Sequence, residues 1–74
     1  MRIYDIEVMA RHYDQDDLML LARTAVEVSK DIETCMLKLN RTSGTIAEYL
    51  ASVWHDVNDL GFASLDAVAL QSKQ

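Results

Sequence analysis

Apolar residues recur with the period of a helix through the first half of the chain, which predicts one long helix over about residues 15–39. Its apolar repeat, with alternating spacings of three and four, is Leu18, Leu21, Ala25, Val28, Ile32, Cys35 and Leu39. This is the a/d spacing of a helix that packs or self-associates along one seam. Asp14 is placed to cap the helix, and Asp16 and Asp17 put negative charge in its first turn, where the helix dipole favours it.

Other apolar side chains of this helix lie outside the seam. Met19, Val26 and Leu37 fall roughly 100–140° from its centre, at about 100° per residue. The residues that widen the seam on the same side are Ala22, Ser29 and Met36. A helix with one neighbour needs a single stripe about 100° wide, so the broader stripe predicts a central helix between two neighbours. The alternative is a few exposed apolar residues, which any protein surface carries.

A break at residues 40–44 separates the long helix from a second one, predicted over 45–60. Gly44 suits a left-handed turn. The apolar repeat of the second helix is Ile46, Leu50, Val53, Val57 and Leu60. Gly61 is expected to end this helix, with Phe62 making the apolar contact that accompanies such a stop. Ser64 then caps a short C-terminal helix over 64–72, whose inward side includes Leu65.

The first thirteen residues allow two interpretations. The residues that share one face of a helix are Ile3, Ile6, Met9, Ala10 and Tyr13, whereas Tyr4, Ile6 and Val8 alternate with Asp5 and Glu7 as in a strand. A lone strand would need another chain to pair with, so the helix is favoured. The pattern as a whole predicts a single all-α domain over 1–74. We expect a small three- to four-helix bundle built around the long central helix, with 1–13 as a separate N-terminal helix or arm.

Length and composition support this fold and predict association. The 74 residues include no proline and two glycines, too few for the turn every 8 to 12 residues of an all-β chain. A helix of about 25 residues is about 37 Å long, longer than the roughly 29 Å diameter of a compact chain of this size. Such small domains bury only about 60% of their unfolded surface. We therefore expect a homodimer or heterodimer with the long helix in the interface. The alternative is a monomeric bundle whose long helix bends or frays.

The chain is acidic, with a formal net charge of −5. Proteins that bind nucleic acid usually present a basic face, so nucleic acid is an unexpected partner. Acidity favours a basic partner or serves solubility alone. No apolar run approaches the roughly 18 residues of a membrane span, and the first residues lack the apolar core of a signal peptide. With a single cysteine, these features favour a cytoplasmic protein that does not contact membranes.

Few residues suggest chemistry. Cys35 lies on the seam, so we interpret it as a small buried hydrophobe and not as a reactive thiol. His55 and Asp59 stand one turn apart, but a zinc site takes three or four ligands. No serine lies in a nucleophile-elbow motif, and no glycine-rich phosphate loop is present. We therefore expect no enzymatic activity, no cofactor and no bound metal.

The remaining function is protein binding. We expect a small acidic adaptor, inhibitor or secretion-type chaperone that holds a partner's helix against an apolar face, or that self-associates. The partner-binding residues that we predict are Met19, Val26, Met36, Leu37, Tyr4 and Tyr13.

Two alternatives remain. An acidic DNA mimic would use the sparse carboxylate row Glu48, Asp56, Asp59 and Asp66, and its affinity would fall steeply with salt. A helix-turn-helix regulator would use the outline of residues 45–72, but its second helix has no arginine for base or phosphate contacts.

Overall fold

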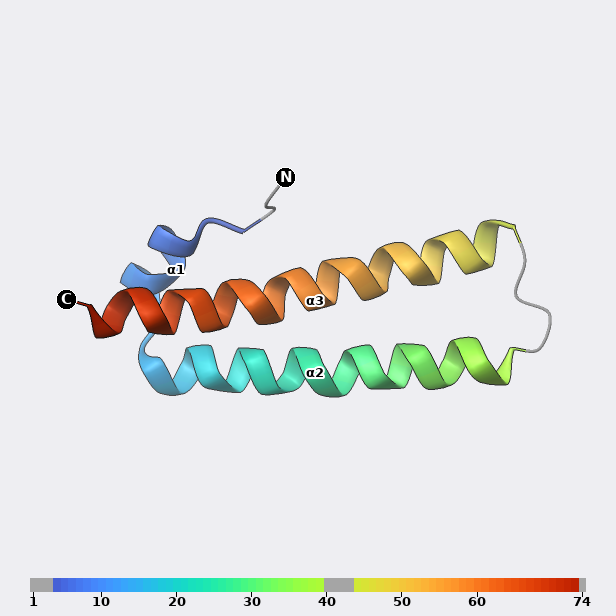
Figure 1. The fold of residues 1–74 in the computed structure, drawn as a ribbon, viewed down its shortest axis with the longest axis horizontal. Coiled ribbons are helices and arrows are strands. Elements are labelled where there is room, and N and C mark those ends of the chain that lie inside the picture. The colour runs from blue at the N-terminus through green and yellow to red at the C-terminus, as the bar shows by residue number, and fades with distance from the viewer. Residues whose placement is uncertain (1–3, 40–43, 74) are drawn as a thin grey trace.

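The computed structural model describes residues 4–39 and 44–73, and these residues form three helices and no strand (Figure 1). The helices are α1 (Ile6–His12), α2 (Gln15–Lys38) and α3 (Thr45–Ser72). The predicted all-α fold is confirmed, and α2 and α3 form an antiparallel hairpin. Residues 40–43, where the sequence places the break between these helices, lie outside the described residues. Gly44 has a φ of 62°, as expected for a turn glycine.

The first helix, α1, begins at a local cap. The Asp5 carboxylate accepts a hydrogen bond from the backbone N–H of Val8 at 3.2 Å, which satisfies a donor that the helix itself leaves unpaired. At its other end Tyr13 has an extended backbone. Of the two interpretations of residues 1–13, the helix is therefore confirmed over Ile6–His12, while residues 1–3 lie outside the described part.

The second helix, α2, also begins where local chemistry predicts. The Asp14 Oδ1 atom accepts from the backbone N–H of Asp17 at 2.8 Å, and Asp16 and Asp17 occupy the first turn. The helix ends at Lys38, which places positive charge in its last turn. Both ends agree with the predicted range of about 15–39.

The face that α2 turns toward α3 is rotated by about 60° from the predicted seam. The buried residues of this face are Leu18, Ala22, Ala25 and Ser29. Val28, Cys35 and Leu39 are exposed in the single chain, so Cys35 is not the buried residue that we expected. Whether this part of the seam packs against a second chain stays a prediction. Small side chains explain the rotation, because alanine and serine let two helix axes approach more closely than valine and leucine do.

The third helix, α3, runs through Gly61 without a break, so the predicted stop there and the separate helix over 64–72 are wrong. Gly61 is buried against α2, and a Cβ atom added to it would lie 3.2 Å from the Ala25 Cβ atom. The glycine therefore allows a close helix contact. Ser64 is buried and donates to the Leu60 carbonyl at 2.8 Å instead of capping a helix, and Phe62 is exposed. The turn of the helix-turn-helix outline is absent from this stretch.

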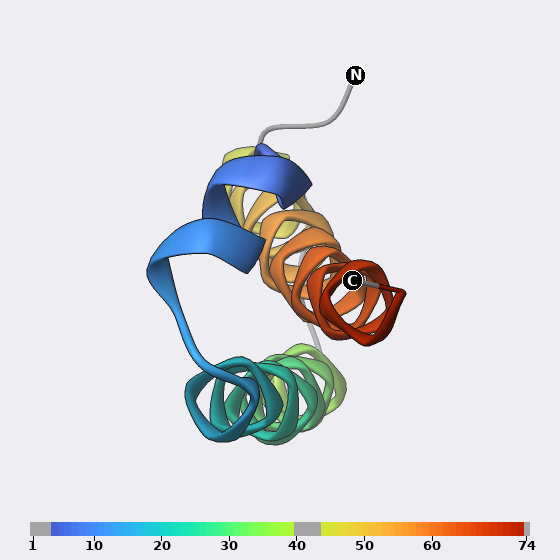
Figure 2. The ribbon, with the colours of Figure 1, turned by 90° about the vertical axis from the view of Figure 1, so that its left-hand side faces the viewer.

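The central helix is α3 and not α2, which corrects the prediction. α3 packs along α2, and α1 packs against α3 near the C-terminal end of α3, as Figure 2 shows in the view along the hairpin. The core at this end is formed by Met9, Leu18, Ala63 and Ala67, with Tyr4, Ile6, Ala10, Leu21, Leu60 and Val68 packed around it. Gln71 ties α3 to the end of α1, since its side-chain amide donates to the Ala10 carbonyl at 2.9 Å.

The resulting molecule is long and thin, with extents of 49 × 22 × 15 Å and a Cα radius of gyration of 14.5 Å. A compact chain of this length would have a radius of gyration of about 11 Å. The surface area is 5711 Å², whereas a compact monomer of 8.4 kDa exposes about 4,600 Å². The hairpin therefore leaves exposed roughly 1,100 Å² more than a compact monomer would.

Candidate functional site

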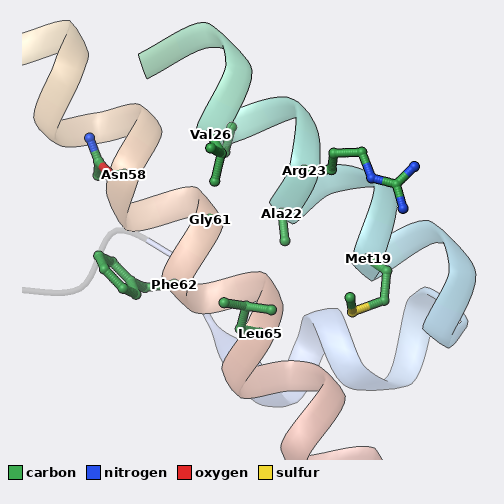
Figure 3. A pocket seen from close by; sticks show the side chains of 9 residues that line it. Met19, Ala22, Arg23, Val26, Asn58, Gly61, Phe62 and Leu65 are labelled. Atoms are coloured by element: carbon green, nitrogen blue, oxygen red, sulfur yellow. The ribbon is translucent and has the colours of Figure 1, made fainter. Parts of the chain in front are cut away.

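An apolar groove lies between α2 and α3 and encloses about 230 Å³ (Figure 3). Its floor consists of Ala22 and Ala25 from α2 and Gly61 from α3. These residues are small because the helices meet there, as the 3.2 Å approach between Ala25 and an added Gly61 Cβ atom shows. The contact that joins the helices thus also creates a shallow floor between taller side chains.

The rims of the groove carry large apolar side chains. Met19 and Val26 stand on α2, while Phe62 and Leu65 stand on α3. All four are exposed, Phe62 at 66% and Val26 at 51% of its surface. Exposed apolar residues that gather around one hollow are a sign of a binding surface, unlike scattered single ones.

Polar groups at the groove are few. The Asn58 side-chain amide donates to the Trp54 carbonyl at 2.9 Å, so one of its donors is already used within α3. Arg23 lines the α2 side, and its guanidinium points away from α3 (Figure 3). Beneath the groove, the buried Ser29 hydroxyl donates to the Val26 carbonyl at 2.9 Å. Across residues 4–39 and 44–73, no buried side-chain nitrogen or oxygen lacks a hydrogen-bond partner. The lining of the groove is mostly apolar.

A second hollow extends the groove toward the loop end of the hairpin. It is lined by Glu33, Met36, Ala51 and Trp54, and the Trp54 indole N–H donates to Glu33 Oε1 at 3.1 Å. Glu33 follows Val26 by seven residues on α2, and Ala51 precedes Asn58 by seven on α3, so each pair shares one side of its helix. The two hollows therefore lie on the same side of the hairpin.

The predicted partner-binding residues of α2 divide between these places. Met19 and Val26 lie in the groove, and Met36 lies in the second hollow. Leu37 is 80% exposed and lines neither. Their role in binding stays a prediction. Three of the four line a hollow, and Leu37, which follows Met19 by five complete turns, lies on the same side of α2.

The two tyrosines that were predicted as partner contacts lie elsewhere. Tyr4 is half-buried against the core under α1. Tyr13 is exposed at the end of α1, and its backbone carbonyl accepts from the Gln71 amide at 2.6 Å. Tyr4 is therefore packed and the backbone at Tyr13 is held by Gln71, while their role in binding stays a prediction.

Sequence reasoning missed Phe62 and Leu65 as groove residues. Both were misplaced because Gly61 was interpreted as a helix end, which assigned Phe62 to a stop contact and Leu65 to an inward face. A continuous helix would have placed Leu65 seven residues after Asn58 and on the same side. The spacing of these residues in the sequence was therefore sufficient to place them on the groove side, but only if α3 was assumed to continue through Gly61.

The remaining findings concern other kinds of site. Within the described residues, no three side chains from His, Cys, Asp and Glu gather closely enough to hold a metal ion. His55 packs edge-on against the Trp54 ring at 5.1 Å between ring centroids. None of the helices α1 to α3 has both the length and the apolar character to cross a membrane. Comparison of the chain with protein-family models, with curated proteins and with solved structures gave no match.

Proposed function

We propose that this protein is a non-enzymatic interaction module that binds an amphipathic helix of a partner protein in the groove between α2 and α3. The observation that carries the proposal is the arrangement of Met19, Val26, Phe62 and Leu65, four exposed apolar side chains around a floor of two alanines and a glycine. An apolar helix face laid into such a groove is a common mode of peptide recognition.

The length of the surface suits a helix. From Met19 to Met36, the groove and the second hollow span seventeen residues of α2, about 25 Å at 1.5 Å per residue. A partner helix of about 18 residues would cover this distance with anchors at i, i+4, i+7 and i+11. Met19 and Met36 at the two ends are flexible side chains that adapt to the anchors they meet.

Charge predicts the polar flank of the partner. Between Thr45 and Ser72, α3 carries four carboxylates, Glu48, Asp56, Asp59 and Asp66, and no lysine or arginine. Glu48, Asp59 and Asp66 share one side of α3 beside the groove, whereas Asp56 lies about 160° around the helix from Asn58. A partner helix with basic residues along its α3 side would complement the first three. On the α2 side the groove is lined by Arg23, so we expect the basic flank on the α3 side alone. The single cysteine, which leaves no intramolecular disulfide, favours a cytosolic setting for this interaction.

Binding energy comes mainly from the rims. Complete burial of a valine, leucine, phenylalanine or methionine is worth about 1.5–3 kcal/mol. The four rim side chains are about half exposed, so covering them contributes about 1 kcal/mol each. Replacing one of these side chains by aspartate would remove its contribution to the binding free energy and add the cost of desolvating a carboxylate. We therefore expect Val26→Asp to weaken binding at least about tenfold, which corresponds to 1.4 kcal/mol.

The test uses a synthetic helical peptide of about 18 residues, with leucines at the anchor positions and lysines on one flank. Trp54, the single tryptophan, lines the second hollow and reports binding by its fluorescence. The matched control is Leu20→Asp, because Leu20 is an equally exposed apolar residue of α2 on the side away from the groove. Circular dichroism verifies that both variants stay helical. The proposal fails if Val26→Asp binds the peptide as well as the unchanged protein does, or if Leu20→Asp weakens binding equally.

A further inference from the structure

The second hollow combines a carboxylate with an aromatic ring. It encloses about 250 Å³ between Glu33 and Met36 of α2 and Ala51 and Trp54 of α3. The hydrogen bond from the Trp54 indole N–H to Glu33 Oε1, at 3.1 Å, holds the carboxylate beside the ring and joins the two helices. The groove differs from this hollow, because none of the residues that line the groove is acidic.

The carboxylate decides which kind of side chain suits the second hollow. An apolar side chain seated there would remove water from Glu33 without offering the charge a partner, which is costly. A lysine or arginine would replace that water with a charge-assisted hydrogen bond to the carboxylate. Its aliphatic stem would lie along the apolar walls of the hollow, and its cationic head would be attracted to the face of the Trp54 ring.

The charges of the two helices leave this place to a cation from outside. α3 carries no lysine or arginine. On α2, Lys30 precedes Glu33 by three residues, but it lies about 100° around the helix from the buried Ser29, whereas Glu33 lies about 40° from it. Lys38 lies on the opposite side, about 180° from Ser29. The hollow therefore presents its carboxylate between the helices, and the lysines of α2 lie farther from α3.

The second hollow also has a fixed distance from the groove. Glu33 follows Val26 by seven residues on α2, which is about 10.5 Å along the helix. A partner helix that lies along the hairpin places one side chain beside Val26 and the side chain seven residues away beside Glu33. This spacing is the same whether the partner helix runs parallel or antiparallel to α2.

We propose that the second hollow binds a lysine or arginine side chain that lies within the apolar face of the partner helix, seven residues from the apolar anchor that meets Val26. The inference rests on the proposed function, because one helix fills both hollows. It makes Glu33 a specificity-determining residue. It also separates the partner from an amphipathic helix whose basic residues lie on its flank alone.

The test compares peptides that differ at one anchor. In the synthetic peptide of about 18 residues, the first or the last leucine anchor is replaced by lysine or by norleucine, which has the same aliphatic stem without the charge. Both ends are tested because the direction of the bound helix decides which end meets the second hollow. At one end we expect the lysine peptide to bind about fivefold more tightly than the norleucine peptide.

Two variants identify the carboxylate. Glu33→Gln should abolish the preference for lysine, and it keeps an oxygen that can accept from the Trp54 indole. Glu27→Gln is the matched control, because Glu27 is exposed, lies about 120° around α2 from Glu33 and removes the same charge. It should retain the preference. Equal binding of lysine and norleucine at both ends overturns the proposal, as does a preference that Glu33→Gln retains or that Glu27→Gln also abolishes.

A second measurement does not depend on the groove. The indole N–H signal of Trp54, the single tryptophan, is followed by NMR while n-butylammonium chloride is added as a mimic of the lysine side chain. We expect a saturable shift that sodium chloride at the same ionic strength does not produce and that Glu33→Gln abolishes. If the all-leucine peptide does not bind, the proposed function fails, and this titration decides the present proposal, which the absence of a saturable shift then overturns.

Discussion

The contact between Gly61 and Ala25 makes the substitution Gly61→Leu informative. A leucine in place of a glycine within a helix gains about 0.8 kcal/mol of helix propensity. At this position even the first side-chain carbon would lie 3.2 Å from the Ala25 Cβ atom and 3.9 Å from the Ala22 carbonyl oxygen. Because α2 must move to accommodate the rest of the side chain, we place the overpacking cost at about 3 kcal/mol, the upper end of its usual range.

The expected net loss is therefore about 2 kcal/mol, which lowers Tm by about 8–16 °C in a domain of this size. Thermal unfolding followed by circular dichroism measures it, at one protein concentration because association changes the apparent Tm. Ser52→Leu, at an exposed position of the same helix, is the matched control and should change stability by less than about 0.5 kcal/mol. A Gly61→Leu variant that melts at the same temperature or higher would refute the close helix contact.

A double substitution tests the same contact without adding volume. Gly61→Ala together with Ala25→Gly moves one methyl group across the contact and leaves the two helices with the same composition. We expect the double variant to lie within about 0.5 kcal/mol of the unchanged protein and to be more stable than the sum of the two single changes predicts, because the methyl group that Gly61→Ala adds would fill the space that Ala25→Gly leaves. Strict additivity of the two single changes would show that the residues do not touch. Since Gly61 is also the groove floor, Gly61→Leu should in addition abolish binding of the lysine-flanked peptide.

Two further predictions concern the core and the role of charge. Leu18 is fully buried, so Leu18→Ala should lower the free energy of unfolding, measured by chemical denaturation, by about 2–5 kcal/mol. The exposed Leu20 is the control, and Leu20→Ala should lower it by less than about 0.5 kcal/mol. Equal losses for the two variants would contradict the observed orientation of α2. Raising the ionic strength from about 0.01 M to about 1 M shortens the Debye length from about 30 Å to about 3 Å. The lysine-flanked peptide should then bind several-fold more weakly but still measurably, because its apolar contacts do not depend on salt. A complete loss of peptide binding in salt would instead indicate recognition by charge, as in an acidic mimic of DNA.

The start of α2 is the feature of this fold that the sequence determines most directly. Asp14 caps α2, and its carboxylate accepts a hydrogen bond from the backbone N–H of Asp17, three residues away. A hydrogen bond across three residues depends on the local chain alone, so a capping rule is sufficient to predict it. The all-α class follows for the same reason, since helical periodicity and a scarcity of turn residues are local properties.

Gly61 shows where local rules fail. A glycine that follows an apolar repeat and precedes a phenylalanine has the local signature of a helix end. The helix continues because the residue opposite, Ala25, is distant in sequence and close in space, and the contact between them favours a position without a side chain. The assignment of Phe62 and Leu65, and with it half of the groove, depended on this one tertiary contact.

The choice of packing face was likewise decided by the tertiary structure. The most apolar stripe of α2 includes Val28 and Cys35, yet the helix turns Ala22, Ala25 and Ser29 toward α3 and leaves those two exposed. Apolar periodicity tells which stripes of a helix avoid water. Which stripe packs against which neighbour depends on how closely the two helix axes can approach each other. That distance depends on the side chains of both helices, so it cannot be predicted from the sequence of either helix alone.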